Sequence, residues 1–237
     1  MKNLHIEMKD IYKSYDDLEV ITDFNMNFSS DKVHCFFGPS GCGKTTLVNI
    51  LTRVISPDNG QIKGIDKKKV SYVFQEDRLL PWATLEENIL FVLESFYNKT
   101  EAQKVVDKYL SLVDLLKFKN HYPNELSGGM KQRASIARAL AYGGEILVMD
   151  EPFKGLHLEL KNNLMDYIVN NWNYKDSFLF FITHDIDEAL YLADKIYIFN
   201  GPPLKIQKQI TINIHSSDRK RHSREMRKYK TMILEDT

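Results

Sequence analysis

The stretch from Gly38 to Thr46, G-P-S-G-C-G-K-T-T, constrains the fold more than any other part of the chain. It matches the pattern G-x-x-x-x-G-K-[ST], follows an apolar run at 33–37 and precedes apolar residues at helical spacing. This order predicts a strand, a glycine-rich turn and a helix start. Inward-facing backbone N–H groups and a helix N-terminus both favour an anion, so the stretch indicates a nucleoside triphosphate site.

The residues of this turn have separate expected roles. We expect Lys44 to reach the β- and γ-phosphates and the Thr45 hydroxyl to ligate Mg²⁺. The residues expected to contact ATP are Gly38, Pro39, Ser40, Gly41, Cys42, Gly43, Lys44, Thr45 and Thr46. The motif by itself does not say what the bound nucleotide is used for.

Composition narrows the class of protein. A chain of 237 residues with 43% hydrophobic content can form one large α/β domain, or a core with a subdomain. The 32 basic and 32 acidic residues cancel, which argues against a dedicated nucleic-acid binder. The two cysteines, Cys35 and Cys42, are not placed for a disulfide, so a reducing cytosol is expected. We see no signal peptide and no membrane-spanning run.

Hydrophobic patterning predicts strands that alternate with helices. Two antiparallel strands are expected around 4–8 and 24–28. Further strands are expected at 33–37, 61–63, 70–74, 145–149, 177–183 and 195–200, and helices after the glycine-rich turn and at 84–96, 100–116, 127–141, 158–172 and 186–193. Such alternation implies a mostly parallel sheet with helices on its faces. Residues 76–141 are interpreted as a helical insertion.

Three helix starts carry sequence signals. Thr84 with Glu87 has the spacing of a capping box, and Thr100 with Gln103 has the same spacing. Ser127 is expected to cap the helix that follows it.

A second constellation lies at the end of the strand predicted at 145–149. Asp150 follows this buried strand directly, and its carboxylate is expected to hold Mg²⁺ directly or through water. Glu151, one residue further on, is expected to polarise the attacking water as a general base.

The element Leu126-Ser127-Gly128-Gly129, followed by a helix, resembles the signature of ATP-binding-cassette (ABC) ATPases. Ser127, Gly128 and Gly129 can form a second phosphate grip at a helix N-terminus. The resemblance covers residues 1 to about 200. It implies a P-loop NTPase (RecA-like) core with a mostly parallel sheet, an N-terminal antiparallel β subdomain and an inserted α-helical subdomain. It also implies that the grip closes on ATP held by another subunit, so that hydrolysis requires a head-to-tail dimer.

The resemblance assigns further roles by position. Gln75 looks like the Q-loop glutamine, which touches Mg²⁺ and senses the γ-phosphate. His184, in F-I-T-H-D, looks like the switch histidine, which hydrogen-bonds the γ-phosphate and the attacking water; the alternative is an ordinary loop histidine. Tyr15 matches the aromatic residue that stacks on adenine, although a ring that covers the sheet edge has the same sequence pattern.

Two residues depart from the family pattern. Met130 replaces the usual glutamine of the signature, and His157 replaces the D-loop aspartate, which in the family helps shape the partner's P-loop. We expect catalysis to survive, because the residues named for it are present: Lys44, Gln75, Asp150, Glu151 and His184. A nucleotide-binding subunit with reduced hydrolysis is the alternative.

The segment 73–82, V-F-Q-E-D-R-L-L-P-W, resembles the Q-loop region of bacterial importers for nitrate, aliphatic sulfonates and taurine, whose relatives handle thiamine-precursor pyrimidines. It implies transmembrane permease subunits, indirect action with an extracytoplasmic solute-binding protein, and a peripheral place on the cytoplasmic face of the cell membrane. Leu79, Leu80 and Trp82 either receive a permease helix or pack the insertion. A soluble ABC ATPase that acts on nucleic acid or ribosomes is less favoured, because the insertion is short, one cassette is present and the net charge is zero.

The expected organisation is a single ABC ATP-binding domain over 1–237. Its parts are an α/β core with the β subdomain (1–75 and 142–200), a helical subdomain (76–141) and a C-terminal extension (201–237). The stretch 217–230 carries seven Lys or Arg residues against two acids. It is interpreted as a solvated helix face, or as a contact with anionic lipid head groups.

Overall fold

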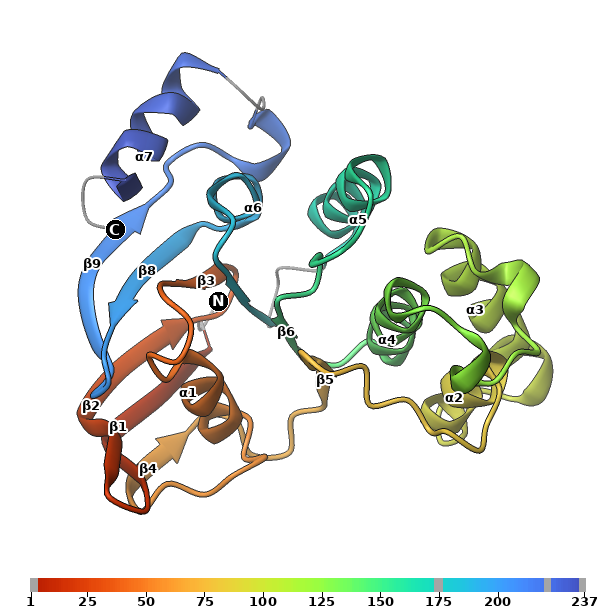
Figure 1. The fold of residues 1–237 in the computed structure, drawn as a ribbon, viewed down its shortest axis with the longest axis horizontal. Helices are drawn as coiled ribbons and strands as arrows, with labels where there is room; N and C mark the ends of the chain where they lie inside the picture. The colour runs from red at the N-terminus through yellow and green to blue at the C-terminus, as the bar shows by residue number, and fades with distance from the viewer. Residues whose placement is uncertain (1–3, 173–176, 220–222, 235–237) are drawn as a thin grey trace. The chain divides into compact units, whose positions relative to one another are not determined.

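The structure is a computed structural model that describes residues 4–172, 177–219 and 223–234 (Figure 1). The chain divides into two compact units. The first comprises residues 1–68 and 167–237, and the second comprises residues 69–166. Within the described residues, no helix is both long and apolar enough to cross a membrane.

The N-terminal part of the first unit is an antiparallel sheet. Strands β1 (His5–Tyr15), β2 (Leu18–Ser29) and β4 (Asn59–Lys63) pair in the order β2-β1-β4. Met8 lies opposite Met26 and Ile6 opposite Phe28, and all four side chains are buried. Their alternation with polar residues gives the sheet one apolar face, as the sequence predicts.

The same unit contains a second set of strands. β3 (Val33–Phe37) runs parallel to both β7 (Phe178–Thr183) and β8 (Lys195–Asn200), and β9 (Lys205–Thr211) pairs antiparallel with β8. Every residue of β3 and β7 is buried, as expected for parallel strands covered on both faces. The helices α1 (Lys44–Leu51) and α6 (Ile186–Leu192) belong to this unit.

Strand β9 was not among the predicted elements. Most of its residues are exposed, Lys208 is half-buried and only Ile210 is buried, because the strand pairs along one edge. An edge strand rich in lysine and glutamine carries little of the hydrophobic pattern from which strands are predicted. The predicted C-terminal extension, residues 201–237, therefore includes a strand of the sheet.

The basic stretch 217–230 is only partly solvated, and its residues 220–222 lie outside the described part. Arg219 is 4% exposed, and its guanidinium contacts the Asp194 carboxylate at 2.7 Å. Helix α7 (Arg224–Leu234) buries Met226 and Ile233. The interpretation as a solvated face is therefore wrong for Arg219, which is a buried structural residue.

The second unit combines two strands with helices. β5 (Val70–Val73) and β6 (Ile146–Asp150) are parallel, with Val73 opposite Met149. The helices are α2 (Leu85–Leu93), α3 (Lys99–Leu112), α4 (Gly128–Tyr142) and the start of α5 (Leu158–Asn171), with short 3-10 turns at Leu116–Phe118 and Pro123–Glu125. An α/β fold with a mostly parallel sheet and an antiparallel N-terminal sheet is confirmed. The domain boundaries at 76 and 141 remain a prediction.

The helix caps test the sequence signals individually. Thr84 and Glu87 form the predicted capping box: the Glu87 N–H donates to Thr84 Oγ1 at 3.2 Å and the Thr84 N–H to Glu87 Oε2 at 2.8 Å. The prediction of Thr100 as a cap is wrong. Asn98, with Glu101, caps α3 two residues earlier, because asparagine is as good an N-cap and its glutamate partner also lies three residues on.

The end of α3 also differs from the prediction. The helix ends at Leu112, and Leu116 lies in the following 3-10 turn rather than on the helix face.

Candidate functional site

The glycine-rich turn has the glycine-specific backbone conformation that its sequence indicates. Gly38, Gly41 and Gly43 have φ values of +148°, +81° and +107°. A Cβ on Gly38 would lie 2.4 Å from the carbonyl oxygen of Phe199, so the neighbouring strand β8 leaves no room for a side chain there. Gly38 is therefore required by the packing of the unit itself.

The turn ends at the N-terminus of α1. Gly43 is the N-cap, and within the described residues no side chain caps this helix. The first turn, Lys44-Thr45-Thr46, has no acid, so the positive end of the helix dipole faces no carboxylate of its own turn. The Lys44 ammonium donates to the carbonyls of Gly38 at 2.9 Å and Pro39 at 2.6 Å, and it is 7% exposed. The Lys44 side chain thus places its positive charge over the turn.

His184 lies at the same sheet edge as this turn. β3 and β7 are parallel neighbours, with Phe37 opposite Thr183. Gly38 and His184 therefore follow adjacent strands at their carboxyl ends, the usual place for ligand sites in parallel sheets. His184 is exposed at this edge. The sequence predicted both residues, but the pairing of their strands comes from the structure.

Tyr15 ends β1 and is 47% exposed. The Lys13 ammonium lies 5.4 Å from its ring centroid and contacts the Asp58 carboxylate at 2.5 Å. An exposed aromatic face suits stacking on a base.

In the second unit, Gln75 comes shortly after β5, and the acidic pair lies at the end of the adjacent parallel strand β6, with Asp150 as its last residue. Because Val73 lies opposite Met149, Gln75 and Glu151 leave the same edge of β5 and β6. Asp150 is 2% exposed, whereas Gln75 is exposed. Burial, and then the Asp150 carboxylate, raises the pKa of Tyr72 well above its ordinary value.

The segment before Gln75 is held by a stack of side chains. The Tyr72 and Phe74 rings are stacked with centroids 3.9 Å apart, and the Arg78 guanidinium lies 4.1 Å from the Phe74 centroid. The stack fixes the exit of β5 at Gln75, a feature that the sequence did not predict.

Glu151 adopts a backbone conformation that is uncommon for its residue type. Its φ is +46°, in the left-handed region that favours glycine. Its carboxylate contacts the Lys154 ammonium at 3.0 Å. Strain of this kind gathers at functional sites, where the surrounding structure maintains it.

The signature residues form the start of α4. Ser127 is the N-cap, as predicted, and its hydroxyl oxygen accepts a hydrogen bond from the Met130 N–H at 3.3 Å. No described atom lies within 4 Å of a Cβ built on Gly128, and the nearest to one on Gly129 is the Gly155 carbonyl oxygen at 3.8 Å. The buried Gln132 amide donates to the Pro152 carbonyl at 3.1 Å, which ties α4 to the segment after Glu151.

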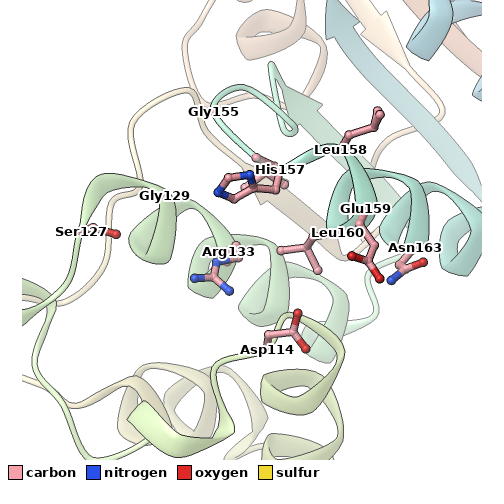
Figure 2. A pocket seen from close by; sticks show the side chains of 11 residues that line it. Asp114, Ser127, Gly129, Arg133, Gly155, His157, Leu158, Glu159, Leu160 and Asn163 are labelled. Carbon is pink, nitrogen blue, oxygen red and sulfur yellow. The ribbon is translucent and has the colours of Figure 1, made fainter.

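Ser127 and Gly129 share one pocket with His157 (Figure 2). The cavity has a volume of about 1010 Å³ and is also lined by residues that sequence reasoning missed: Asp114, Arg133, Glu159 and Asn163. Arg133 follows Gly129 by four residues, so helical spacing could have found it. The position that departs from the family pattern therefore lies beside the signature turn.

The apolar residues of segment 73–82 divide into two kinds. Leu79 is 8% exposed and Leu80 is half-buried, whereas Trp82 is 74% exposed. Outside the segment, Phe91 of α2 is 63% exposed. Buried Asn88 accepts from the Leu80 N–H at 2.7 Å and donates to the Ala83 carbonyl at 3.0 Å. The Asn88 side chain thus fixes the backbone at residues 80–83, while the Trp82 side chain is exposed.

A glycine-rich turn before an α1 helix, on a parallel sheet with polar residues at its carboxyl edge, defines a P-loop nucleotide-binding protein. The family model described as "ABC transporter" matches residues 21–154, and the chain belongs to this family. It is an ABC-type ATP-binding protein and an ATP hydrolase.

Two relatives and one solved structure show how far the likeness extends. The chain is 34% identical to the nitrate import ATP-binding protein NrtD of Synechocystis sp., over 89% of this chain and 84% of the relative. It is 37% identical to the aliphatic sulfonates import ATP-binding protein SsuB of Bacillus anthracis, over 96% of this chain and 92% of the relative. The dimeric ATP-binding cassette MJ0796, in a post-hydrolysis state with ADP and Pi, superposes with a TM-score of 0.78 at 26% identity, over 88% of this chain and 99% of that one.

Proposed function

We propose that this chain powers a bacterial importer of small solutes, working as a pair of ATP-binding subunits on the cytoplasmic face of the membrane. The names of NrtD and SsuB and the sequence of segment 73–82 support an importer. The favoured cargo is nitrate, an aliphatic sulfonate, taurine or a thiamine-precursor pyrimidine. The cargo would be chosen by a solute-binding protein that acts with the permease, and nucleic acid has no part in this proposal.

The observation that carries the proposal is the start of α1. Within the described residues it has no side-chain cap, it has no acid in its first turn, and Lys44 lies across the turn before it. Backbone N–H groups from Gly41 to Thr46 and the Lys44 ammonium suit the triphosphate of ATP. Tyr15 would stack on the adenine.

Hydrolysis would depend on residues at the carboxyl edges of the strands. Glu151 takes a proton from the attacking water as general base, and His184 donates a hydrogen bond that orients the γ-phosphate. Lys44 stabilises the charge that develops on the transferred phosphoryl group.

Mg²⁺ fits the donors that the chain offers. By the resemblance to the family, Thr45, Gln75 and Asp150 would hold it through oxygen atoms, the donors that this ion prefers. Among the described residues, no group of three or more His, Cys, Asp or Glu side chains is arranged to hold a metal. Phosphate oxygens of a bound nucleotide are further ligands that Mg²⁺ takes in such sites. When bound, the ion neutralises phosphate charge.

The signature pocket would receive the nucleotide held by a second subunit. Ser127, Gly128 and Gly129 are exposed or partly exposed, and the glycines leave open space in front of the helix. Differential affinity of ATP for the closed pair would then drive closure, and hydrolysis would reopen it. A homodimer is the simplest arrangement.

Trp82 and Phe91 are the exposed apolar residues proposed to meet a permease helix. A Trp82→Ala variant should lose transport and membrane association while keeping its thermal unfolding temperature, since the side chain is 74% exposed. Normal transport by this variant would contradict the docking site.

The experiment that tests the proposed function is ATP turnover by the assembled transporter, compared with a Glu151→Gln variant. We expect turnover well above that of the variant. Equal rates would contradict this role and leave the alternative, a nucleotide-binding subunit with reduced hydrolysis, which His157 in place of the D-loop aspartate suggested in the sequence. The solute-binding protein that co-purifies with the complex would identify the cargo.

A further inference from the structure

The hydroxyl of Thr183, the residue before His184, makes hydrogen bonds with two residues that follow His184. It donates to the Glu188 carboxylate at 2.5 Å and accepts from the Asp185 N–H at 3.0 Å. Thr183 ends β7 and Glu188 lies on α6, so the two bonds join the strand end, the residue after His184 and the helix.

The chemistry of a hydroxyl makes this arrangement directional. A threonine side chain has one hydrogen to donate and two lone pairs. When Glu188 takes that hydrogen, a lone pair of the oxygen is directed toward the Asp185 N–H. Thr183 is 3% exposed and Glu188 is 5% exposed, so water does not readily replace either partner.

Glu188 is itself held in place by the start of α6. Asp185 Oδ1 accepts from the N–H groups of Asp187 at 2.8 Å and Glu188 at 3.2 Å. The helix packs on β3 and β7. The Glu188 charge also reaches Cys35 of β3, where it adds to burial in raising the pKa of the thiol. The carboxylate therefore faces the strands that carry the P-loop and His184.

We propose that Thr183 and Glu188 are positioning residues that fix the backbone of His184 for ATP hydrolysis without touching the nucleotide. This inference rests on the proposed role of His184. The bonds at Thr183 and Asp185 hold both neighbours of His184, so the imidazole keeps one direction relative to the edge of β3 and β7. Losing them leaves the histidine present but misdirected.

The test is steady-state ATP turnover by the assembled transporter with variants of the pair. Thr183→Val keeps the shape but removes both hydrogen bonds, and Glu188→Ala removes the acceptor. Each should lower kcat by roughly tenfold or more, since small misplacements at a reacting centre are costly, and should leave KM for ATP within about twofold. Thr183→Ser retains the hydroxyl and should restore kcat to within about threefold of the unmodified chain.

Asp187→Asn is the matched control, because this carboxylate lies on the same helix but is exposed and contacts Lys230 at 2.7 Å. It should leave kcat unchanged. On a His184→Ala background, Thr183→Val should cause no further loss, because there is no imidazole left to position.

The outcomes separate this inference from the proposed function. If His184→Ala leaves kcat unchanged, the role of His184 fails. If His184→Ala lowers kcat but Thr183→Val and Thr183→Ser behave alike, the positioning pair is wrong. A rise in KM with unchanged kcat, or an additive loss on the His184→Ala background, would also overturn it. Should Glu188→Ala not fold, the two Thr183 variants decide the matter.

Discussion

The chain has two glycine-rich turns that lead into helices, Gly38–Gly43 before α1 and Ser127–Gly129 at the start of α4, and their glycines serve different needs. At Gly38 a Cβ would strike the backbone of β8 at 2.4 Å, whereas around Gly128 no described atom lies within 4 Å of a Cβ. Gly38 is thus required by the packing of its own unit, whereas Gly41 of the same turn has open space, as Gly128 does. The second turn leaves open space, which suits the approach of something from outside the chain.

The N-termini of α1 and α4 also differ in how they are capped. Ser127 caps α4 with its own hydroxyl, while the described residues provide α1 with no side-chain cap and Lys44 lies across its turn. The comparison separates Gly38, which contacts within its own unit explain, from Gly128, which they do not explain and for which we propose contact with a partner's nucleotide. Each of the following predictions concerns either the unit that carries the turn before α1 or the start of α4.

Lys44→Met should have the largest effect on function. The ammonium is the cation that the turn itself presents to phosphate, so ATP turnover should fall by about 10²–10³-fold, as for loss of a key donor to developing charge. The Gly38 and Pro39 carbonyls would also lose a donor. Turnover by the assembled transporter measures this. A less than tenfold loss would contradict the role of the turn.

Gly38→Ala should destabilise the fold, because its Cβ would meet the Phe199 carbonyl oxygen. Together with the φ of +148°, we expect a loss of about 3 kcal/mol in the free energy of unfolding. Denaturant unfolding of the full chain checks this, with Gly128→Ala as the matched control that should change stability little. Similar losses in both variants would break the comparison.

Acid should weaken the unit that carries the P-loop. His34 is fully buried between the Phe180 and Tyr197 rings, and its Nε2–H donates to the Ser29 carbonyl at 2.9 Å while Nδ1 accepts from the Tyr197 hydroxyl at 3.2 Å. Desolvation by burial lowers the pKa of His34 to about 4, from 6.5. The folded chain thus keeps the imidazole neutral.

The direction of the change in stability with pH follows from the protons that the folded and unfolded chains bind. Below pH 6.5 the unfolded chain protonates His34 and the folded chain does not, so this contribution to stability is present above pH 6.5 and is lost as the pH falls from 6.5 to about 4. The loss is at most about 3 kcal/mol. Unfolding of His34→Gln beside the unmodified chain at several pH values measures it. An unchanged pH dependence in the variant would contradict the account.

Ser127→Ala should have the smallest effect on stability. Loss of this cap costs about 1 kcal/mol for an exposed helix start. Because the variant stays folded, the lost cap alone should not change ATP turnover. We expect turnover to fall, since the hydroxyl is also proposed to contact the partner's nucleotide. A stability change with unaltered turnover would leave Ser127 as a cap only.

Local features of both turns could be predicted from the sequence, because their signals lie within a few residues. The P-loop pattern and the Ser127 cap are examples, and the Thr84 capping box of α2 was predictable for the same reason. The capping of α3 was misplaced because Asn98 and Thr100 offer competing signals two residues apart. Strand β9 was missed because an edge strand with one buried residue lacks a hydrophobic pattern.

The long-range part of the site could not be predicted from local pattern. Nothing near Thr183 indicates that β7 pairs with β3, although this pairing places His184 beside Gly38. Nothing near Gln132 indicates its hydrogen bond to Pro152, and His157 was noticed as a departure without its place in the signature pocket. These contacts depend on strand order and packing, which a single sequence does not encode locally.

The central claim is that the space before Gly128 and Gly129 belongs to a second subunit. The direct measurement is the mass, by sedimentation, of the full chain carrying Glu151→Gln, with and without ATP and with or without Gly129→Val. We predict an ATP-dependent dimer that Gly129→Val abolishes, while ATP binding per chain and the unfolding temperature stay unchanged. A dimer that survives Gly129→Val, or a Gly129→Val variant that is destabilised as strongly as Gly38→Ala should be, would contradict the account.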